Sequence, residues 1–193
     1  PDLGLTYAFG DSVDLRLATH TIPDEDSPDI SQDDFTLQAY SDASYGGESC
    51  DKAKSQTGYL IFLGGGLIDW KSSLQKVIAL SSAESESNSA FDTARSIVHF
   101  RQLLEELGHF QDGATTIWQD NQACIAQSKN PINPAANRHV LIRYHYLRHL
   151  TESQIVRLSY INTLDQLADI LTKPTDLATF MRLRPYLVAP TSR

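Results

Sequence analysis

The sequence has few cysteines and no long apolar run. Only two of its 193 residues are cysteines, Cys50 and Cys124, and they lie far apart without a C-x-x-C motif. This arrangement is typical of reduced structural thiols and disfavours a disulfide framework or a cysteine zinc site. No apolar stretch approaches the roughly 18 residues of a membrane span, and no secretory leader or lipidation signal is evident. We therefore expect a soluble, intracellular protein without a membrane partner.

Basic residues are scarce at the start of the chain. The net charge is −8, and residues 1–36 alone account for it, because they contain nine acidic side chains and a single basic one, Arg16. The rest is balanced, with fifteen side chains of each sign. Between Lys129 and Arg184, eight basic residues and three histidines stand against four acidic residues. This local excess suits phosphate binding, although a solvated surface of mixed charge explains it equally well.

Composition divides the chain into three parts. Residues 21–34, TIPDEDSPDISQDD, combine two prolines with many acids, which is typical of a loop or linker. Before them, residues 3–7 and 13–19 predict two short strands. We expect an acidic N-terminal segment and linker over residues 1–36, one folded domain over residues 37–173, and a C-terminal helix or tail over residues 174–193.

From residue 35 onward, the hydrophobic patterns predict regular elements. Strands are expected over residues 35–41, 57–64, 67–72, 115–119 and 155–161, with a glycine turn at residues 64–66 and the first strand half-buried. Helices are expected over residues 82–107, 120–129, 138–152 and 165–172. Three antiparallel strands followed by alternating helices and strands predict an α/β fold, with a mixed five-stranded sheet and helices on its faces.

Acidic residues stand at or near the ends of four of these elements. They are Asp42, Asp120, Asp169 and one of the pair Glu84 and Glu86. Converging carboxylates repel one another unless a cation neutralises them, and hard oxygen ligands suit Mg²⁺ or Mn²⁺. Taken singly, Asp120 could cap the next helix, Asp169 could be solvated, and Glu86 could favour the positive helix end. Asp42 is the hardest to explain structurally, because aspartate is depleted in strands.

Helix geometry chooses between the two glutamates. Residues two apart on a helix point about 200° apart, so Glu84 and Glu86 cannot both face one site. Ser81 and Glu84 fit the S-x-x-E capping box, in which the glutamate returns to the backbone amide of Ser81. Glu86 is then the glutamate that is free to reach the other acids.

Together these motifs resemble one family. The stretches AYSDASYGG, KSQTGYLIFLGGG, WKSSLQK, ALSSAESES, WQDNQACIAQSKNP, RHVLIRYHYLRHL and QLADILTKP are similar, in order and spacing, to the ribonuclease H domain of copia-type (Pseudoviridae-like) LTR retrotransposon polyproteins. The resemblance covers roughly residues 37 to 173. DLGLTY at the start resembles the end of the connection that follows the reverse transcriptase domain in those polyproteins.

The resemblance implies a metal-dependent ribonuclease H. Such enzymes cut the RNA strand of RNA/DNA hybrids with two divalent cations, Mg²⁺ or Mn²⁺, and leave 5′-phosphate products. The family's metal ligands fall on Asp42, Glu86, Asp120 and Asp169, with Asp42 bridging both ions. The resemblance also implies a fused reverse transcriptase domain and a cytoplasmic location in virus-like particles, or a nuclear one. We expect the isolated domain to be monomeric.

Several positions depart from the family pattern. Ser44, Ala83 and Ser87 replace residues that are usual in the family, and the segment before Asp169 lacks the histidine of cellular and retroviral relatives. The alternative is a catalytically inactive or domesticated module of the same fold that binds nucleic acid or protein. An integrase of this fold is disfavoured by the fourth acid and by the three-stranded meander.

The helix over residues 138–152 mixes basic and aromatic residues, and we expect it beside the hybrid, with Leu141, Tyr144 and Leu147 in the core. His145 and His149 have a zinc-like spacing, but no third ligand is evident nearby. Hydroxyl and amide groups next to the acids are candidates for reading 2′-hydroxyls, and His139 or His145 for replacing the missing loop histidine. The candidate nucleic-acid-binding residues are Ser44, Ser82, Asn121, Gln122, Arg138, His139, Arg143 and His145.

Overall fold

The computed structural model describes residues 3–4, 35–46, 53–129, 138–187 and 189–190, and their side chains except at 3–4, 138–141 and 189–190. The strand expected over residues 13–19, the linker over residues 21–34 and Cys50 lie outside the described residues. Within the described part, the chain has no helix both long enough and apolar enough to cross a membrane.

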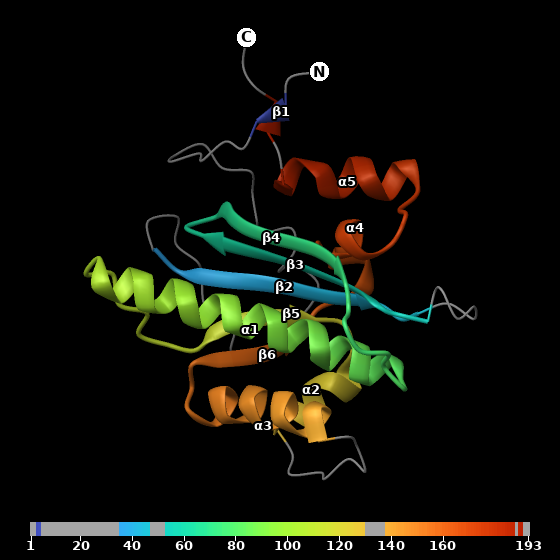
Figure 1. Ribbon diagram of the computed structural model, residues 1–193. Helices are drawn as coiled ribbons and strands as arrows, with labels where there is room; N and C mark the ends of the chain where they lie inside the picture. The colour runs from blue at the N-terminus through green and yellow to red at the C-terminus, as the bar shows by residue number, and fades with distance from the viewer. Residues whose placement is uncertain (1–2, 5–34, 47–52, 130–137, 188, 191–193) are drawn as a thin grey trace.

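The central feature is a five-stranded sheet in the order β4-β3-β2-β5-β6. The first three strands pair antiparallel, whereas β2, β5 and β6 pair parallel (Figure 1). This arrangement confirms the predicted mixed sheet. A separate antiparallel pair joins β1 (Leu3–Gly4) to β7 (Ala189–Pro190). The strands of the sheet are β2 (Leu37–Ser44), β3 (Gln56–Leu63), β4 (Gly66–Leu74), β5 (Thr115–Gln119) and β6 (Val156–Tyr160).

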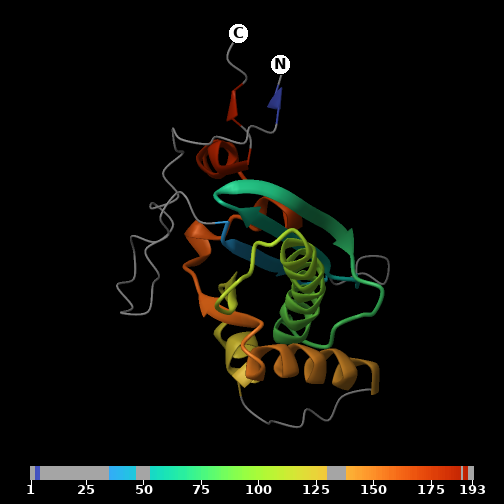
Figure 2. The ribbon, with the colours of Figure 1, turned by 90° about the vertical axis from the view of Figure 1, so that its left-hand side faces the viewer.

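Helices cover both faces of the sheet (Figure 2). Helices α1, α2 and α3 pack on one face, and α4 and α5 lie on the other. The closing helix expected over residues 165–172 is shorter, because a 3-10 turn at Thr163–Asp165 precedes α4. The helices are α1 (Ser82–Glu106), α2 (Gln122–Lys129), α3 (Arg138–Glu152), α4 (Asp169–Thr172) and α5 (Leu177–Leu187).

Alternating residues of the central strands feed two hydrophobic cores. On β3, Tyr59 and Ile61 join the core under α1, whereas Leu60 and Phe62 join the core under α5. Leu183 of α5 is 1% exposed and covers this second face. The expectation of a half-buried first strand is therefore wrong, because β2 is buried on both faces.

Local signals set the ends of α1. Ser81 is the N-cap, and its hydroxyl accepts a hydrogen bond from the backbone amide of Glu84 at 3.1 Å. Gly108 follows the helix with φ of 85°, the left-handed conformation that glycine adopts readily. Leu107 is the C-cap residue, and its side chain is exposed.

The glycine turn between β3 and β4 has the expected form. Gly64 and Gly65 have positive φ values of 54° and 80°, as the two central residues of a type I′ hairpin turn do. The turn therefore joins β3 and β4 as a hairpin.

Gly58 lets α4 approach the backbone of β3. Gly58 is paired with Asp42 across the β2–β3 ladder. A Cβ atom at Gly58 would lie 2.5 Å from Cγ2 of Thr172 and 3.0 Å from the carbonyl oxygen of Ala168. Helix α4 therefore rests directly on the strand beside Asp42, at a distance that only glycine permits.

We expect Gly58→Ala to lower the free energy of unfolding by about 1 to 3 kcal/mol, because the added methyl group must displace α4. Urea denaturation measures this change. Gly113→Ala is the matched control, since a Cβ atom there would meet nothing within 4 Å. Equal stability of the two variants would show that α4 does not depend on this close approach.

Candidate active site

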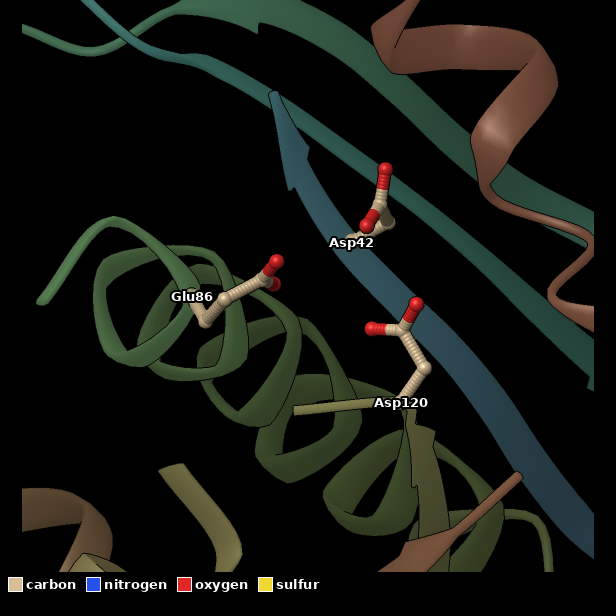
Figure 3. Close-up of side chains that lie close together, drawn as sticks. All are labelled: Asp42, Glu86 and Asp120. Atoms are coloured by element: carbon tan, nitrogen blue, oxygen red, sulfur yellow. The ribbon is translucent and has the colours of Figure 1, made fainter. Parts of the chain in front are cut away.

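Three acidic side chains meet at one edge of the sheet. Asp42 lies near the carboxyl end of β2, and Asp120 directly follows β5. Because these strands are parallel neighbours, their carboxyl ends lie at the same edge. Glu86, in the second turn of α1, reaches the same point from the helix, so that three different elements converge (Figure 3).

The three carboxylates are close enough to share a cation. One oxygen each of Asp42, Glu86 and Asp120 can be chosen so that all three lie within 4.8 Å of one another. In the described part of the chain this is the only group of three or more acids, histidines or cysteines with that spacing. Asp42 and Glu86 are buried, and Asp120 is half-buried. His145 and His149 are both exposed and belong to no such group.

Neutral donors orient each of these carboxylates. Gln119 donates from Nε2 to Oε2 of Glu86 at 2.6 Å. Thr163 donates from its hydroxyl to Oδ2 of Asp120 at 2.9 Å. Thr172 donates from its hydroxyl to Oδ2 of Asp42. These hydrogen bonds fix side-chain directions without neutralising the negative charge.

Asp169 lies beside the three-acid group without belonging to it. It is the first residue of α4, and its Oδ2 atom forms an ion pair of 2.9 Å with Nζ of Lys173. Its Oδ1 atom is buried and has no hydrogen-bond partner. Asp169 faces Asp42 closely enough to raise the pKa of the Asp42 carboxyl. The fourth predicted acid is thus next to the site, held by a lysine.

Gln166 anchors the segment that carries Asp169. Its Nε2 atom donates to the carbonyl oxygen of Ser41 at 3.0 Å and to that of Trp118 at 3.4 Å. Its Oε1 atom accepts from the backbone amide of Ala168 at 3.3 Å. The side chain is fully buried, so it ties the turn before α4 to β2 and β5.

Burial and mutual repulsion disfavour the charged forms of these acids. Burial, followed by the charges of Asp42 and Asp120, raises the pKa of Glu86 to about 9. Burial raises the pKa of Asp42 to about 6, and the hydrogen bond from Thr172 opposes this rise. The pKa of Asp120 is also raised, mainly by burial. A bound cation would relieve this cost, because it stabilises all three ionised forms at once.

The two glutamates of α1 occupy different places. Glu84 caps the helix: its Oε2 atom accepts from the backbone amide of Leu80 at 2.9 Å. The capping-box expectation named the amide of Ser81, so the contact lies one residue further upstream. Glu86 points into the acidic group, as Figure 3 shows.

The polar residues that flank the acids differ in exposure, and one of them already forms a hydrogen bond within the protein. Ser82 and Gln122 are exposed, and Ser44 is half-buried at the end of β2. Asn121 accepts from the backbone amide of Cys124 at 3.0 Å and so caps α2. The sequence left open that Asp120 performs this capping, but Asn121 does so, and Asp120 is available to the site.

Helix α3 presents a mixture of exposed and internally bound side chains. Arg143 donates to Oδ1 of Asn88 at 2.8 Å, and its guanidinium lies 5.5 Å from the ring centre of Phe91. Tyr144 and Leu147 are buried, as expected, whereas His145 is exposed. The side chains of Arg138, His139 and Leu141 lie outside the described residues.

Four contacts of the site were not expected from the sequence. They involve Gln119, Thr163, Thr172 and Lys173. Gln119 and Thr163 carry no local signal, because they meet their partners only in the folded chain. The spacing from Asp169 to Lys173, four residues along a helix, is one at which opposite charges regularly pair. That spacing would have indicated the ion pair.

Solved structures of ribonucleases H share this arrangement of strands and helices. LC11-RNase H1, isolated from compost by a metagenomic approach, aligns with a TM-score of 0.51 at 12% identity, covering 72% of this chain and 93% of that one. A structure of LC11-RNase H1 in complex with an RNA/DNA hybrid aligns with a TM-score of 0.50 at 11% identity, covering 71% and 94%. The chain therefore has the ribonuclease H fold.

Curated sequences then place the chain in a family. It is 37% identical over 140 residues to the retrovirus-related Pol polyprotein from transposon TNT 1-94 of Nicotiana tabacum, covering 72% of this chain and 10% of that protein. It is 36% identical over 146 residues to the polyprotein from transposon RE1 of Arabidopsis thaliana, covering 76% and 10%. The chain belongs to the retrovirus-related Pol polyproteins of copia-type transposons, as their ribonuclease H domain.

This chain spans about a tenth of the length of these relatives. No family model matches the sequence.

The raised pKa values predict how stability changes with pH in the metal-free protein. The unfolded chain releases the Glu86 proton near the ordinary value of 4.5, whereas the folded protein keeps it until about pH 9. Rising pH therefore favours the unfolded state across this range. We expect the free energy of unfolding in EDTA to fall between pH 5 and pH 8 by about 1 kcal/mol or more.

Chemical denaturation of two variants tests whether Glu86 causes this fall in the free energy of unfolding. Glu86→Gln should remove most of the fall, because glutamine cannot titrate. Glu84→Gln, on the same helix but outside the acidic group, should retain it. A wild-type stability that rises from pH 5 to pH 8 would contradict the raised pKa of Glu86.

Proposed function

We propose that this domain is a metal-dependent endonuclease that hydrolyses the RNA strand of RNA/DNA hybrids during retrotransposon reverse transcription. The observation that carries the proposal is the convergence of Asp42, Glu86 and Asp120 within 4.8 Å at one edge of a ribonuclease H sheet. Membership of a Pol polyprotein family supports the biological setting.

The residues of the site fit divalent metal ions. All the candidate ligands are carboxylate oxygens, the donor type that Mg²⁺ and Mn²⁺ prefer. The raised pKa values of Asp42, Glu86 and Asp120 reflect a charge that the protein itself does not fully compensate. The buried Oδ1 atom of Asp169 also lacks a partner. We propose two ions held by Asp42, Glu86, Asp120 and Asp169.

The chain's own contribution is to hold the carboxylates in place. When bound, two ions would lower the pKa of an attacking water and stabilise the leaving 3′ oxygen, giving a 5′-phosphate product. Asp42 has the most rigid support, because β2 is buried on both faces at the centre of the sheet. Gln119 directs Glu86, and Thr163 directs Asp120, so each carboxylate is oriented before a substrate arrives.

The hybrid is proposed to lie across the acidic edge and the exposed face of α3. A structure of LC11-RNase H1 contains an RNA/DNA hybrid, which supports this class of substrate for the same fold. Of the predicted contacts, Ser82, Gln122 and His145 have exposed side chains, and Ser44, Asn121 and Arg143 have half-buried ones. Arg143 is the least suited of the predicted contacts, because Asn88 and Phe91 already engage it.

The setting of the reaction is part of the same proposal. We propose that the domain works as a monomeric module joined to the reverse transcriptase of its polyprotein. The proposed location is the virus-like particle in the cytoplasm, or the nucleus.

Removing a central carboxylate should abolish cleavage. We expect Asp42→Asn and Asp120→Asn each to slow cleavage of a labelled RNA/DNA hybrid in Mg²⁺ or Mn²⁺ by at least about a hundredfold, as loss of one electrostatic stabiliser does elsewhere. Asp92→Asn is the control, because Asp92 pairs with Lys71 at 2.7 Å and lies outside the acidic group. Hybrid binding without cleavage by the wild type would favour the inactive module.

The two glutamates should separate activity from stability. Glu86→Gln is expected to abolish cleavage of the same hybrid, because it removes a carboxylate of the acidic group. Glu84→Gln should remain active and lose about 0.5 kcal/mol of stability, because it removes a negative charge from the first turn of α1 while the glutamine can still accept from the Leu80 amide. Gel assays and urea denaturation measure the two effects. The reverse pattern would show that Glu84 is the functional glutamate.

A further inference from the structure

Lys173 places a positive charge against the acidic site. Its Nζ atom lies 2.9 Å from Oδ2 of Asp169. The same ammonium lowers the pKa of Asp42 and of Asp120, opposing the burial that raises them. Lys173 is the positively charged group that opposes burial at both of these acids. The metal-free site therefore already has a partial counter-charge from its own chain.

One turn of helix presents both groups that hold the neighbouring aspartates. Thr172 donates to Oδ2 of Asp42, and Lys173 pairs with Oδ2 of Asp169. This turn is docked on the backbone of β3 at Gly58, where a Cβ atom would lie 2.5 Å from Thr172. Because α4 has no room to move closer, the position of Asp169 relative to Asp42 is set by packing.

Only one of the two carboxylate oxygens of Asp169 has a partner. Its side chain is 9% exposed, and its Oδ1 atom is buried without a hydrogen-bond partner. An ionised carboxylate oxygen left in this state is costly unless an ion or a donor reaches it. Yet Asp169 is absent from the group of carboxylates within 4.8 Å, while its other oxygen is bound by the ammonium.

We propose that Lys173 is an internal counter-cation, which occupies Asp169 in the metal-free protein and releases it when divalent ions bind. This inference rests on the proposed function, since it assumes that the site takes divalent cations. Asp42, Glu86 and Asp120 then form the part of the site that is ready for an ion, and Asp169 completes it only after Lys173 leaves. Lys173 is accordingly a positioning residue that sets metal affinity.

The chemistry of lysine suits this exchange. Its ammonium is a strongly hydrated point charge on a flexible stem, and the Lys173 side chain is 43% exposed. The charged end can therefore move from Asp169 into water without unpacking α4. A divalent ion carries twice the charge, so it competes well for a carboxylate that the lysine holds singly.

A double-mutant cycle in two conditions tests the exchange directly. The wild type, Asp169→Asn, Lys173→Gln and the double variant are unfolded with urea, first in EDTA and then in saturating Mn²⁺. We expect a favourable coupling between the two residues in EDTA that falls to less than about half in Mn²⁺, because the contact is then broken. A coupling that Mn²⁺ leaves unchanged would overturn the proposal.

Metal binding gives a second measurement that does not depend on catalysis. By calorimetry, Lys173→Gln should bind Mn²⁺ on the order of tenfold more tightly than the wild type, since the competing cation is gone. Lys173→Arg keeps the charge and should remain near the wild type. Lys71→Gln is the matched control, because Lys71 is similarly exposed, at 38%, but pairs with Asp92. Equal tightening in Lys71→Gln would overturn the proposal.

The outcomes separate this inference from the proposed function. A wild type that shows no heat of Mn²⁺ binding and no stabilisation by Mn²⁺ would refute the metal-dependent function, and the counter-cation with it. A wild type that binds Mn²⁺ and cleaves hybrids, with Lys173→Gln unchanged in affinity, would refute the counter-cation alone.

Discussion

The repulsion among buried carboxylates is the constraint on which the rest of this structure depends. Asp42 and Glu86 are 3% and 6% exposed, and an oxygen of Asp120 lies within 4.8 Å of one from each. Such a group would spread apart if its supports were flexible. Instead, Asp42 stands on the central strand, and Glu86 stands on a long helix packed against that strand through Ala90, Ala94 and Ile97. The core therefore supplies the rigidity that keeps like charges together.

The C-terminal part of the chain completes this arrangement from the opposite face. Thr172 reaches Asp42 across 130 positions of sequence, and Gln166 reaches Ser41 across 125. The contact of Thr172 requires α4 to lie against β3, which Gly58 permits. A small residue in the middle of a strand, far from any turn, thus determines where the fourth acid lies. The absence of a side chain at Gly58 therefore affects both the packing of α4 and the position of a charged group.

Local patterns predicted most of the fold and the elements that carry the acids. The strand over residues 115–119 and the helix over residues 138–152 have the predicted bounds, and helix geometry separated Glu84 from Glu86 correctly in space. The prediction of a continuous helix over residues 165–172 was wrong. Gln166 lies in a turn there, and its side chain hydrogen-bonds to the backbone of β2 and β5. The full burial of β2 was also missed, since Leu167, Ala168 and Leu183 join Tyr40 of β2 in one hydrophobic cluster only in the tertiary fold.

The charge of the site has a consequence for any substrate made of phosphates. An edge that carries several carboxylates repels a nucleic acid, so cations between the two favour close approach. Lys173 supplies a single positive charge that is already engaged by Asp169. The exposed side of α3 adds further groups, but Arg143 is bound internally by Asn88. Divalent ions would then serve two purposes at this edge: they would hold the carboxylates together, and they would make the surface attractive to the phosphate backbone.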